Sequence, residues 1–192
     1  MRKAYSAILG VLAAVYWLTP LAAAPASGLP RGASELPACR IQIALSPDKH
    51  FAVYVQAAPG AKISTGLGDA DPNQLWLLDT KTRLKTRLVV SKNNDDMKQV
   101  LGGLQSPVFS ADGREVYFLS SAWATSDAVH AVTIKTRKIR FVTDGNSLRV
   151  ITQGHYRGDL VVNKHKYRPN GSGSYDADWL VSPSGREIQV WQ

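Results

Sequence analysis

The chain has 192 residues, of which 23 are Lys or Arg and 15 are Asp or Glu, and its formal net charge is +8. The only cysteine, Cys39, excludes an internal disulfide framework, so a folded domain has to rely on its apolar core. The length suffices for one such core and does not require two domains.

The N-terminus has the composition of a secretory signal peptide. Arg2 and Lys3 precede an uncharged apolar run over residues 7–18. This run is shorter than the roughly 20 apolar residues of a membrane span, so we expect no stable span, with an uncleaved anchor as the alternative. Small residues predict cleavage after Ala26, which makes residues 1–26 a signal peptide and the mature chain periplasmic or secreted.

The residues after the predicted cleavage site divide into a leader and a domain. Residues 27–39 are rich in Pro, Gly, Ala and Ser and predict a flexible leader, whereas residues 40–192 are expected to form one domain. Cys39 stands in a sequence that resembles a lipoprotein box, but it lies too far beyond the apolar run to favour lipidation. Without residues 1–26 the chain keeps 21 basic and 15 acidic residues. An exported basic chain is expected to meet an acidic protein face, an envelope glycan or anionic lipid rather than nucleic acid.

From residue 40 onward, short runs rich in Val, Ile, Leu, Tyr and Trp alternate with turn residues, which is typical of β-strands. Two longer connections, 57–73 and 91–105, interrupt the pattern, and the second can hold one capped helical turn. Twelve runs are expected to be strands in meander order: 40–45, 51–56, 74–79, 84–90, 106–109, 115–120, 128–133, 138–143, 148–152, 159–164, 178–181 and 187–191.

The meander repeats along the chain. Residues 75–83 align without a gap on residues 129–137, and both segments end in Lys-Thr-Arg. Two hairpins in series make a four-stranded meander, and a third, looser copy follows over 152–191. The sequence therefore predicts an all-β, propeller-like stack of about three four-stranded antiparallel meanders. Closed propellers have four to eight such units, so the stack is expected to be open or incomplete, or to form a homodimer in which two copies supply six.

One turn of the repeat carries a family resemblance. The segment Phe109-Ser110-Ala111-Asp112-Gly113-Arg114-Glu115-Val116-Tyr117-Phe118 resembles the Ser-Pro-Asp-Gly blade motif of TolB-type propellers, and residues 45–54 and 181–188 resemble it more weakly. The resemblance covers about a quarter of the mature chain and implies a propeller fold. The stretch from Pro107 to Glu187 also resembles uncharacterised exported proteobacterial proteins. Neither resemblance brings catalytic residues with it.

No group of residues has the spacing of a catalytic or metal site. A Gly-x-Ser-x-Gly elbow in alternating strands and helices is lacking, and the Gly171–Ser174 segment is expected to be a hairpin loop. The histidines lack the spacing of a local metal-binding pair. We therefore predict no catalytic residue, metal or cofactor. A hydrolase, or a peptidase-associated propeller domain, with a site assembled in space is the alternative.

Two segments, 120–126 and 165–176, combine aromatic rings with polar groups. Each joins the two middle strands of its meander, so both are expected to be loops at the same end of the fold. The candidate binding residues are Trp123, Thr125, His165, Lys166, Tyr167, Arg168 and Tyr175. Lys166 and Arg168 would attract anionic groups, and packing of Trp123 and Tyr175 between sheets is the alternative. The sequence thus predicts an exported binding or scaffolding module that contacts a protein or an envelope glycan.

Overall fold

The computed structural model describes residues 42–192, and this part of the chain is almost entirely β-structure. The predicted signal peptide, its cleavage site, the leader and Cys39 lie outside the described residues. Within residues 42–192 no helix is long and apolar enough to cross a membrane.

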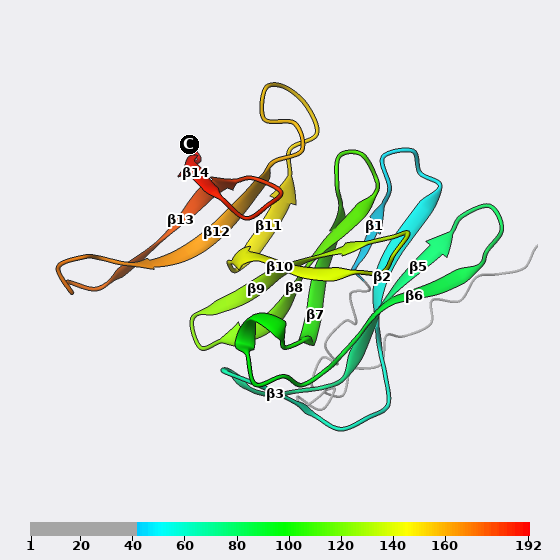
Figure 1. The fold of residues 1–192 in the computed structure, drawn as a ribbon, viewed down its shortest axis with the longest axis horizontal. Coiled ribbons are helices and arrows are strands. Elements are labelled where there is room, and N and C mark those ends of the chain that lie inside the picture. The colour runs from blue at the N-terminus through cyan, green and yellow to red at the C-terminus, as the bar shows by residue number, and fades with distance from the viewer. Residues whose placement is uncertain (1–41) are drawn as a thin grey trace, which may run out of the picture. The chain divides into compact units, whose positions relative to one another are not determined.

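Three four-stranded antiparallel sheets follow one another along the chain (Figure 1). Sheet 1 has the order β1 (Ile43–Leu45), β2 (Phe51–Ala57), β5 (Asn73–Asp79) and β6 (Lys85–Val90). Sheet 2 contains β7 (Gly102–Phe109), β8 (Glu115–Trp123), β9 (Ser126–Thr133) and β10 (Ile139–Asp144). Sheet 3 contains β11 (Ser147–Val150), β12 (Leu160–Tyr167), β13 (Ser174–Val181) and β14 (Glu187–Val190). Each sheet is a meander, and the predicted fold class is confirmed.

The two long connections contain more structure than expected. The first holds a hairpin of β3 (Ile63–Thr65) and β4 (Gly68–Ala70), whose strands are too short to show alternation in the sequence. The second holds one 3-10 turn, η1 (Met97–Gln99), and the Asp96 side chain caps it by accepting a hydrogen bond from the Lys98 backbone N–H. This capped turn confirms the expectation.

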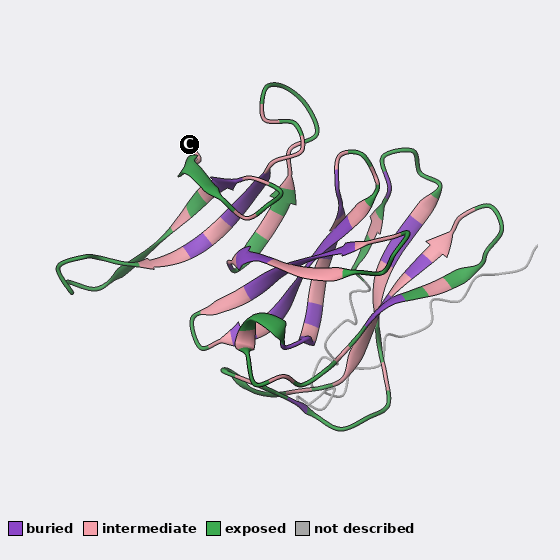
Figure 2. Ribbon diagram, in the orientation of Figure 1, coloured by how far each residue is buried: buried purple, intermediate pink, exposed green. Residues whose placement is uncertain are grey.

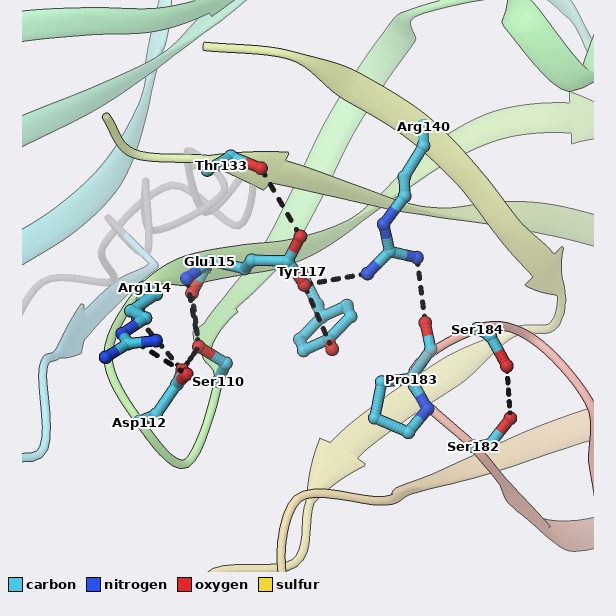
Figure 3. Close-up of polar contacts among 10 residues, drawn as sticks. All are labelled: Ser110, Asp112, Arg114, Glu115, Tyr117, Thr133, Arg140, Ser182, Pro183 and Ser184. Carbon is cyan, nitrogen blue, oxygen red and sulfur yellow. Dashed lines mark hydrogen bonds and ion pairs between the residues drawn. The ribbon is translucent and has the colours of Figure 1, made fainter. Parts of the chain in front are cut away.

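The turn with the TolB-like sequence has the same hydrogen bonds in its first two copies. Between β7 and β8, Ser110 Oγ donates to Asp112 Oδ1 at 2.7 Å and accepts from the Glu115 backbone N–H at 2.9 Å (Figure 3). Ser46 donates to Asp48 in the same way between β1 and β2, at 2.6 Å. The residue after each aspartate has a positive φ, which Gly in the second copy adopts without strain. The motif is therefore a structural turn.

The third copy of this turn lies elsewhere in its sheet. It joins β13 to β14, whereas the first two copies join the first and second strands of their sheets. Ser184 stands where the other copies have Asp, and its hydroxyl lies 2.9 Å from that of Ser182. Gly185 has φ 92° and keeps the geometry of the turn. The weaker sequence match of this copy thus reflects a changed side-chain partner on the same backbone turn.

The core lies between neighbouring sheets, and buried residues are concentrated in the strands (Figure 2). Sheet 2 contributes to both clusters, with Val116 and Phe118 facing one way and the alternating Tyr117 and Leu119 facing the other. One edge strand from each sheet also meets its neighbour, since β1 contacts β7 and β7 contacts β11. The cluster between sheets 1 and 2 contains Val53, Leu75, Leu77, Leu88, Val89, Leu101, Leu104, Phe109, Val116, Phe118 and Val132. The cluster between sheets 2 and 3 contains Tyr117, Leu119, Val129, Ala131, Val142, Leu160, Val162 and Val181.

Candidate functional site

The two segments that hold the candidate residues are mostly strand, and their assignment as loops was wrong. β8 continues to Trp123 and β9 begins at Ser126, so only two residues form the turn between them. β12 and β13 pair over eight residues, although β11 reaches only as far as Asn163 of β12. Residues 164–167 and 174–177 therefore form a two-stranded hairpin that runs beyond the rest of sheet 3 (Figure 1). Polar residues at successive strand positions concealed it in the sequence.

Four of the candidate residues line one open hollow of about 460 Å³, in which sheet 2 supplies Trp123 and Thr125 and sheet 3 supplies His165 and Tyr167. Tyr167 is 69% exposed. The prediction that residues of the two segments lie at the same end of the fold is correct for these four. The other residues that line the hollow are Lys98, Ser126, Phe141 and Asp144, and we call it the aromatic hollow.

Neighbouring segments fix the two walls of this aromatic hollow. The Trp123 ring meets the Phe141 ring edge to face, with centroids 6.2 Å apart. The short connection between sheets 2 and 3 holds the other wall, because the Asn146 side chain donates to the Thr125 carbonyl and its backbone N–H donates to the Asn163 carbonyl of β12. The turn of sheet 2 and strand β12 of sheet 3 are thus tied through one asparagine.

The remaining three candidate residues lie on the other face of the β12–β13 hairpin. Side chains alternate along a strand, so Lys166 points to the face opposite His165 and Tyr167. Tyr175 is directly opposite Lys166 in the register and shares its face. The Arg168 guanidinium lies 5.5 Å from the centre of the Tyr175 ring, a cation–π contact. The hairpin therefore divides the seven candidate residues between two surfaces.

A buried lysine next to this region was not predicted. Lys164 is 1% exposed, and its ammonium group donates to Thr143 Oγ1 at 2.5 Å and lies 2.8 Å from Asp144 Oδ1 and 2.7 Å from Glu187 Oε1. Lys166 also pairs with Glu187 at 2.6 Å. Burial alone would raise the pKa of the Asp144 and Glu187 carboxyls, but the hydrogen bond and charge of Lys164 outweigh it and hold each pKa below its ordinary value. This network joins sheet 2 to sheet 3.

At the opposite end of the same sheets, an arginine makes a second link. Arg140 Nη2 donates to Glu115 Oε2 at 2.7 Å, and Nη1 donates to the Pro183 carbonyl of sheet 3 at 2.8 Å (Figure 3). Thr133 and Tyr117 also contact the Glu115 carboxylate, each at 3.4 Å. A cleft of about 460 Å³ lies beside these groups. The charged groups are paired with one another, so the role of these contacts is to hold sheet 3 against sheet 2.

One hydroxyl–imidazole pair bears on the alternative of a hydrolase. Ser120 Oγ lies 3.1 Å from His130 Nδ1, and His130 Nε2 lies 2.9 Å from the Lys98 carbonyl oxygen. Both residues are at most 1% exposed, and burial lowers the pKa of His130. Among the described residues no carboxylate contacts this histidine, so the pair lacks the third member of a Ser-His-acid triad. Its contacts serve the packing of β8 and β9 against η1.

A second chemical question is whether His, Cys, Asp and Glu side chains could bind a metal ion. Residues 42–192 contain no group of three or more His, Cys, Asp or Glu side chains arranged to hold an ion. The histidine of the aromatic hollow, His165, is engaged through Nδ1 with Asp176 Oδ1 at 2.8 Å. We assign no metal-binding role to the hollow.

No family model and no curated protein matches the chain. Among solved structures it is similar to TolB from Acinetobacter baumannii, with a TM-score of 0.51 and 14% identity over 79% of this chain and 32% of that chain. It is also similar to dipeptidyl peptidase 4 from Porphyromonas gingivalis, with a TM-score of 0.50 and 11% identity over 78% of this chain and 24% of that chain. The chain thus spans about a third of the first protein and a quarter of the second.

Together with the three meanders, these likenesses define the class of protein: a β-propeller module made of face-to-face four-stranded sheets. More narrowly, it has a TolB-like propeller fold, which confirms the resemblance inferred from the turn sequence. Identities this low show the fold alone. Any activity has to be argued from the residues of this chain.

Proposed function

We propose that the chain is an exported binding module that works in the periplasm and contacts an envelope protein or glycan through the aromatic hollow. The observation that carries this proposal is the convergence of Trp123, Thr125, His165 and Tyr167 from two successive sheets on one hollow. Aromatic rings beside hydroxyl and imidazole groups are common anchors of recognition, because they offer a large contact area and directional hydrogen bonds together. The N-terminal charge and apolar run support export.

Tyr167 is the expected anchor of this interaction. Its side chain is 69% exposed and meets the His165 ring edge to face, with centroids 5.1 Å apart. Since Asp176 holds His165, the imidazole gives the tyrosine a fixed neighbour. Packing within the chain does not require so exposed a ring. A bound partner would bury it and gain the apolar contact.

The opposite face of the hairpin has a secondary role in this proposal. Lys166 commits its ammonium group to Glu187 and lies 5.2 Å from the centre of the Trp179 ring, which stiffens the base of the hairpin. Arg168 has no ion pair with any residue of 42–192 and can attract an anionic group of the partner. Its contact with Tyr175 keeps the guanidinium close to the hairpin.

The test measures retention of the mature chain, residues 27–192, on two probes: purified peptidoglycan sacculi and detergent-solubilised envelope protein. Tyr167→Ala should weaken retention on one probe by about 30-fold, the loss of one anchor worth about 2 kcal/mol, while thermal stability stays within about 0.5 kcal/mol. Leu84→Ala is the matched control, because Leu84 is 70% exposed in a turn of sheet 1.

The two probes separate the kinds of partner. Retention on sacculi alone identifies a glycan, and retention on the protein fraction alone identifies an envelope protein. Equal retention of the native chain, Tyr167→Ala and Leu84→Ala on every probe would reject the hollow as the site. Tyr175→Ala then asks whether the other face of the hairpin takes part, and an unchanged affinity would remove it from the site.

A further inference from the structure

Within residues 42–192, sheet 1 has one face packed on sheet 2 and one outer face on which no other sheet lies. The register places two rows of side chains on this outer face, because residues directly opposite each other share a face. Tyr54 is opposite both Ile43 and Trp76, and Ala52 is opposite both Leu45 and Leu78. None of these residues belongs to the cluster between sheets 1 and 2. Ile43 is 60% exposed and Leu45 is 55% exposed.

Basic side chains lie at the β6 end of the same two rows. Arg87 is opposite Trp76, and Lys85 is opposite Leu78. Both are exposed, and neither has an ion-pair partner among residues 42–192. The outer face of sheet 1 is therefore an apolar surface with a basic border.

The outer face of sheet 3 is different. The exposed Asp178 lies on it, because Trp179 and Val181, which follow it in β13, alternate with Leu180 and pack in the cluster between sheets 2 and 3. Trp191 follows β14 on this face, where the Arg149 guanidinium lies 5.5 Å from its ring and the Tyr156 ring meets it edge to face at 5.9 Å. The outer face of sheet 3 is thus an aromatic surface with an acidic residue beside it.

Each of the two sheet junctions within the chain is formed by two sheet faces that bury apolar side chains against each other. A third apolar face with large exposed side chains is therefore expected to be covered by something. The outer faces of sheets 1 and 3 complement each other, apolar against aromatic and basic against acidic. Within one chain sheet 2 lies between them, so a single copy does not bring them together.

We propose that the outer face of sheet 1 packs against the outer face of sheet 3 of a second copy, and that the reciprocal contact forms at the same time. A two-fold axis then generates two identical junctions and closes the assembly. The closed assembly contains six sheets, which lies within the four to eight of known propellers. The second copy continues the packing that already joins sheets 1 and 2 and sheets 2 and 3.

The test uses two charge-reversed forms of the chain spanning residues 27–192, in sedimentation and native mass measurements. The first carries Lys85→Glu and Arg87→Glu, and the second carries Asp178→Lys, which leaves the contact of Asp176 with His165 intact. The native chain should dimerise, and each variant alone should dimerise at least about tenfold more weakly, because like charges then face each other at both junctions. An equimolar mixture of the two variants should form a heterodimer, since every junction again pairs opposite charges.

A matched control reverses two exposed lysines in the β9–β10 turn, Lys135→Glu and Lys138→Glu, and should dimerise like the native chain. Far-UV circular dichroism checks that every variant keeps its β-structure. A native chain that stays monomeric at high concentration overturns the proposal and leaves another segment or a different partner to cover sheet 1. Dimerisation of the Lys85→Glu, Arg87→Glu variant as strong as that of the native chain overturns it as well, and indicates a contact between two copies of sheet 1. A mixture of the two variants that stays monomeric also overturns the proposal.

Discussion

The junction between sheets 1 and 2 and the junction between sheets 2 and 3 are built differently, although both join two copies of one repeat. The first is a cluster of eleven buried apolar residues that includes Phe118 and Leu75. The second has a smaller apolar cluster, and a charged link lies at each end of it: Lys164 with Asp144 and Glu187 at one end and Arg140 with the Pro183 carbonyl at the other.

The two junctions show that copies of one repeated backbone can be joined by either kind of interaction. Apolar burial is non-directional and does not depend on pH, whereas hydrogen-bonded ion pairs need fixed partners and depend on protonation. Sheet 3 supplies two of the eight residues that line the aromatic hollow, so its charged links also hold the position of His165 and Tyr167 relative to Trp123. Breaking each junction separately should show which one the hollow needs.

The largest effect is expected at the apolar junction. Phe118 is fully buried between sheets 1 and 2, and Phe118→Ala should lower the free energy of unfolding by about 3 to 5 kcal/mol, because truncation of a large core side chain leaves a cavity. Chemical denaturation measures this loss. Leu84→Ala, at a site that is 70% exposed, should cost less than about 0.5 kcal/mol. Similar losses for both variants would contradict the assignment of this core.

A somewhat smaller effect is expected at the buried lysine. Lys164→Met keeps the volume but leaves Asp144 and Glu187 without their shared cation, and it should cost about 3 kcal/mol. This loss of free energy lies at the low end of the range for broken buried ion pairs, because both carboxylates remain partly exposed to water. Lys166→Met is the control, since it leaves Lys164 in place and should cost less. Hydrogen exchange should rise in sheet 3 and stay unchanged in sheet 1; a uniform rise would mean that the two junctions are not independent.

The arginine link should contribute less. Arg140→Met removes one ion pair with Glu115 and one hydrogen bond to the Pro183 carbonyl, and we expect a loss of about 1 to 2 kcal/mol. The Arg140 side chain is 35% exposed, so water replaces part of what is lost. Arg137→Met, in the neighbouring exposed turn, is the control. A loss as large as that of Lys164→Met would show that the two ends of the junction carry equal weight.

Local patterns predicted the strands well because they depend on residues close in the chain. Each of the twelve runs holds a strand within residues 42–192, and the turn around Ser110 and Asp112 forms as its sequence indicates. Three features were missed for physical reasons. The strands of the β3–β4 hairpin have only three residues each, too few to show alternation. The hairpin extension around His165 has polar residues on both faces, so no alternation marks it. The burial of Lys164 depends on carboxylates from β10 and β14, which only the packing of two sheets brings to it.

The same limit applies to the candidate site. The alignment of the repeats predicted that Trp123 and Thr125 lie near His165 and Tyr167, and this is correct because equivalent connections of successive sheets lie at one end of the fold. It could not show that Lys166 and Tyr175 face the other way, since that depends on strands continuing through the supposed loop. Phe141 and Lys98 were missed because they reach the hollow from segments that carry no aromatic cluster of their own.

The smallest expected effect is a dependence on pH that belongs to the junction between sheets 2 and 3. Lys164 holds the pKa of the Asp144 and Glu187 carboxyls below their ordinary values in the folded chain. Groups with a lowered folded-state pKa stabilise the fold at neutral pH, and this contribution is lost as the pH falls below about 5 and through the folded pKa values. Asp48, Asp79 and Asp112 also have lowered pKa values, from hydrogen bonds within their turns, so acid weakens those turns too.

A comparison of the native chain with Lys164→Met separates the two sources of acid sensitivity. Both proteins are denatured at pH values from 7 to 3, and the variant should lose less stability in acid. The reason is that its Asp144 and Glu187 no longer have a buried cation to stabilise their charged forms. Equal losses in the two proteins would assign the acid sensitivity to the turn aspartates and would leave the junction with sheet 3 as independent of pH as the apolar junction with sheet 1.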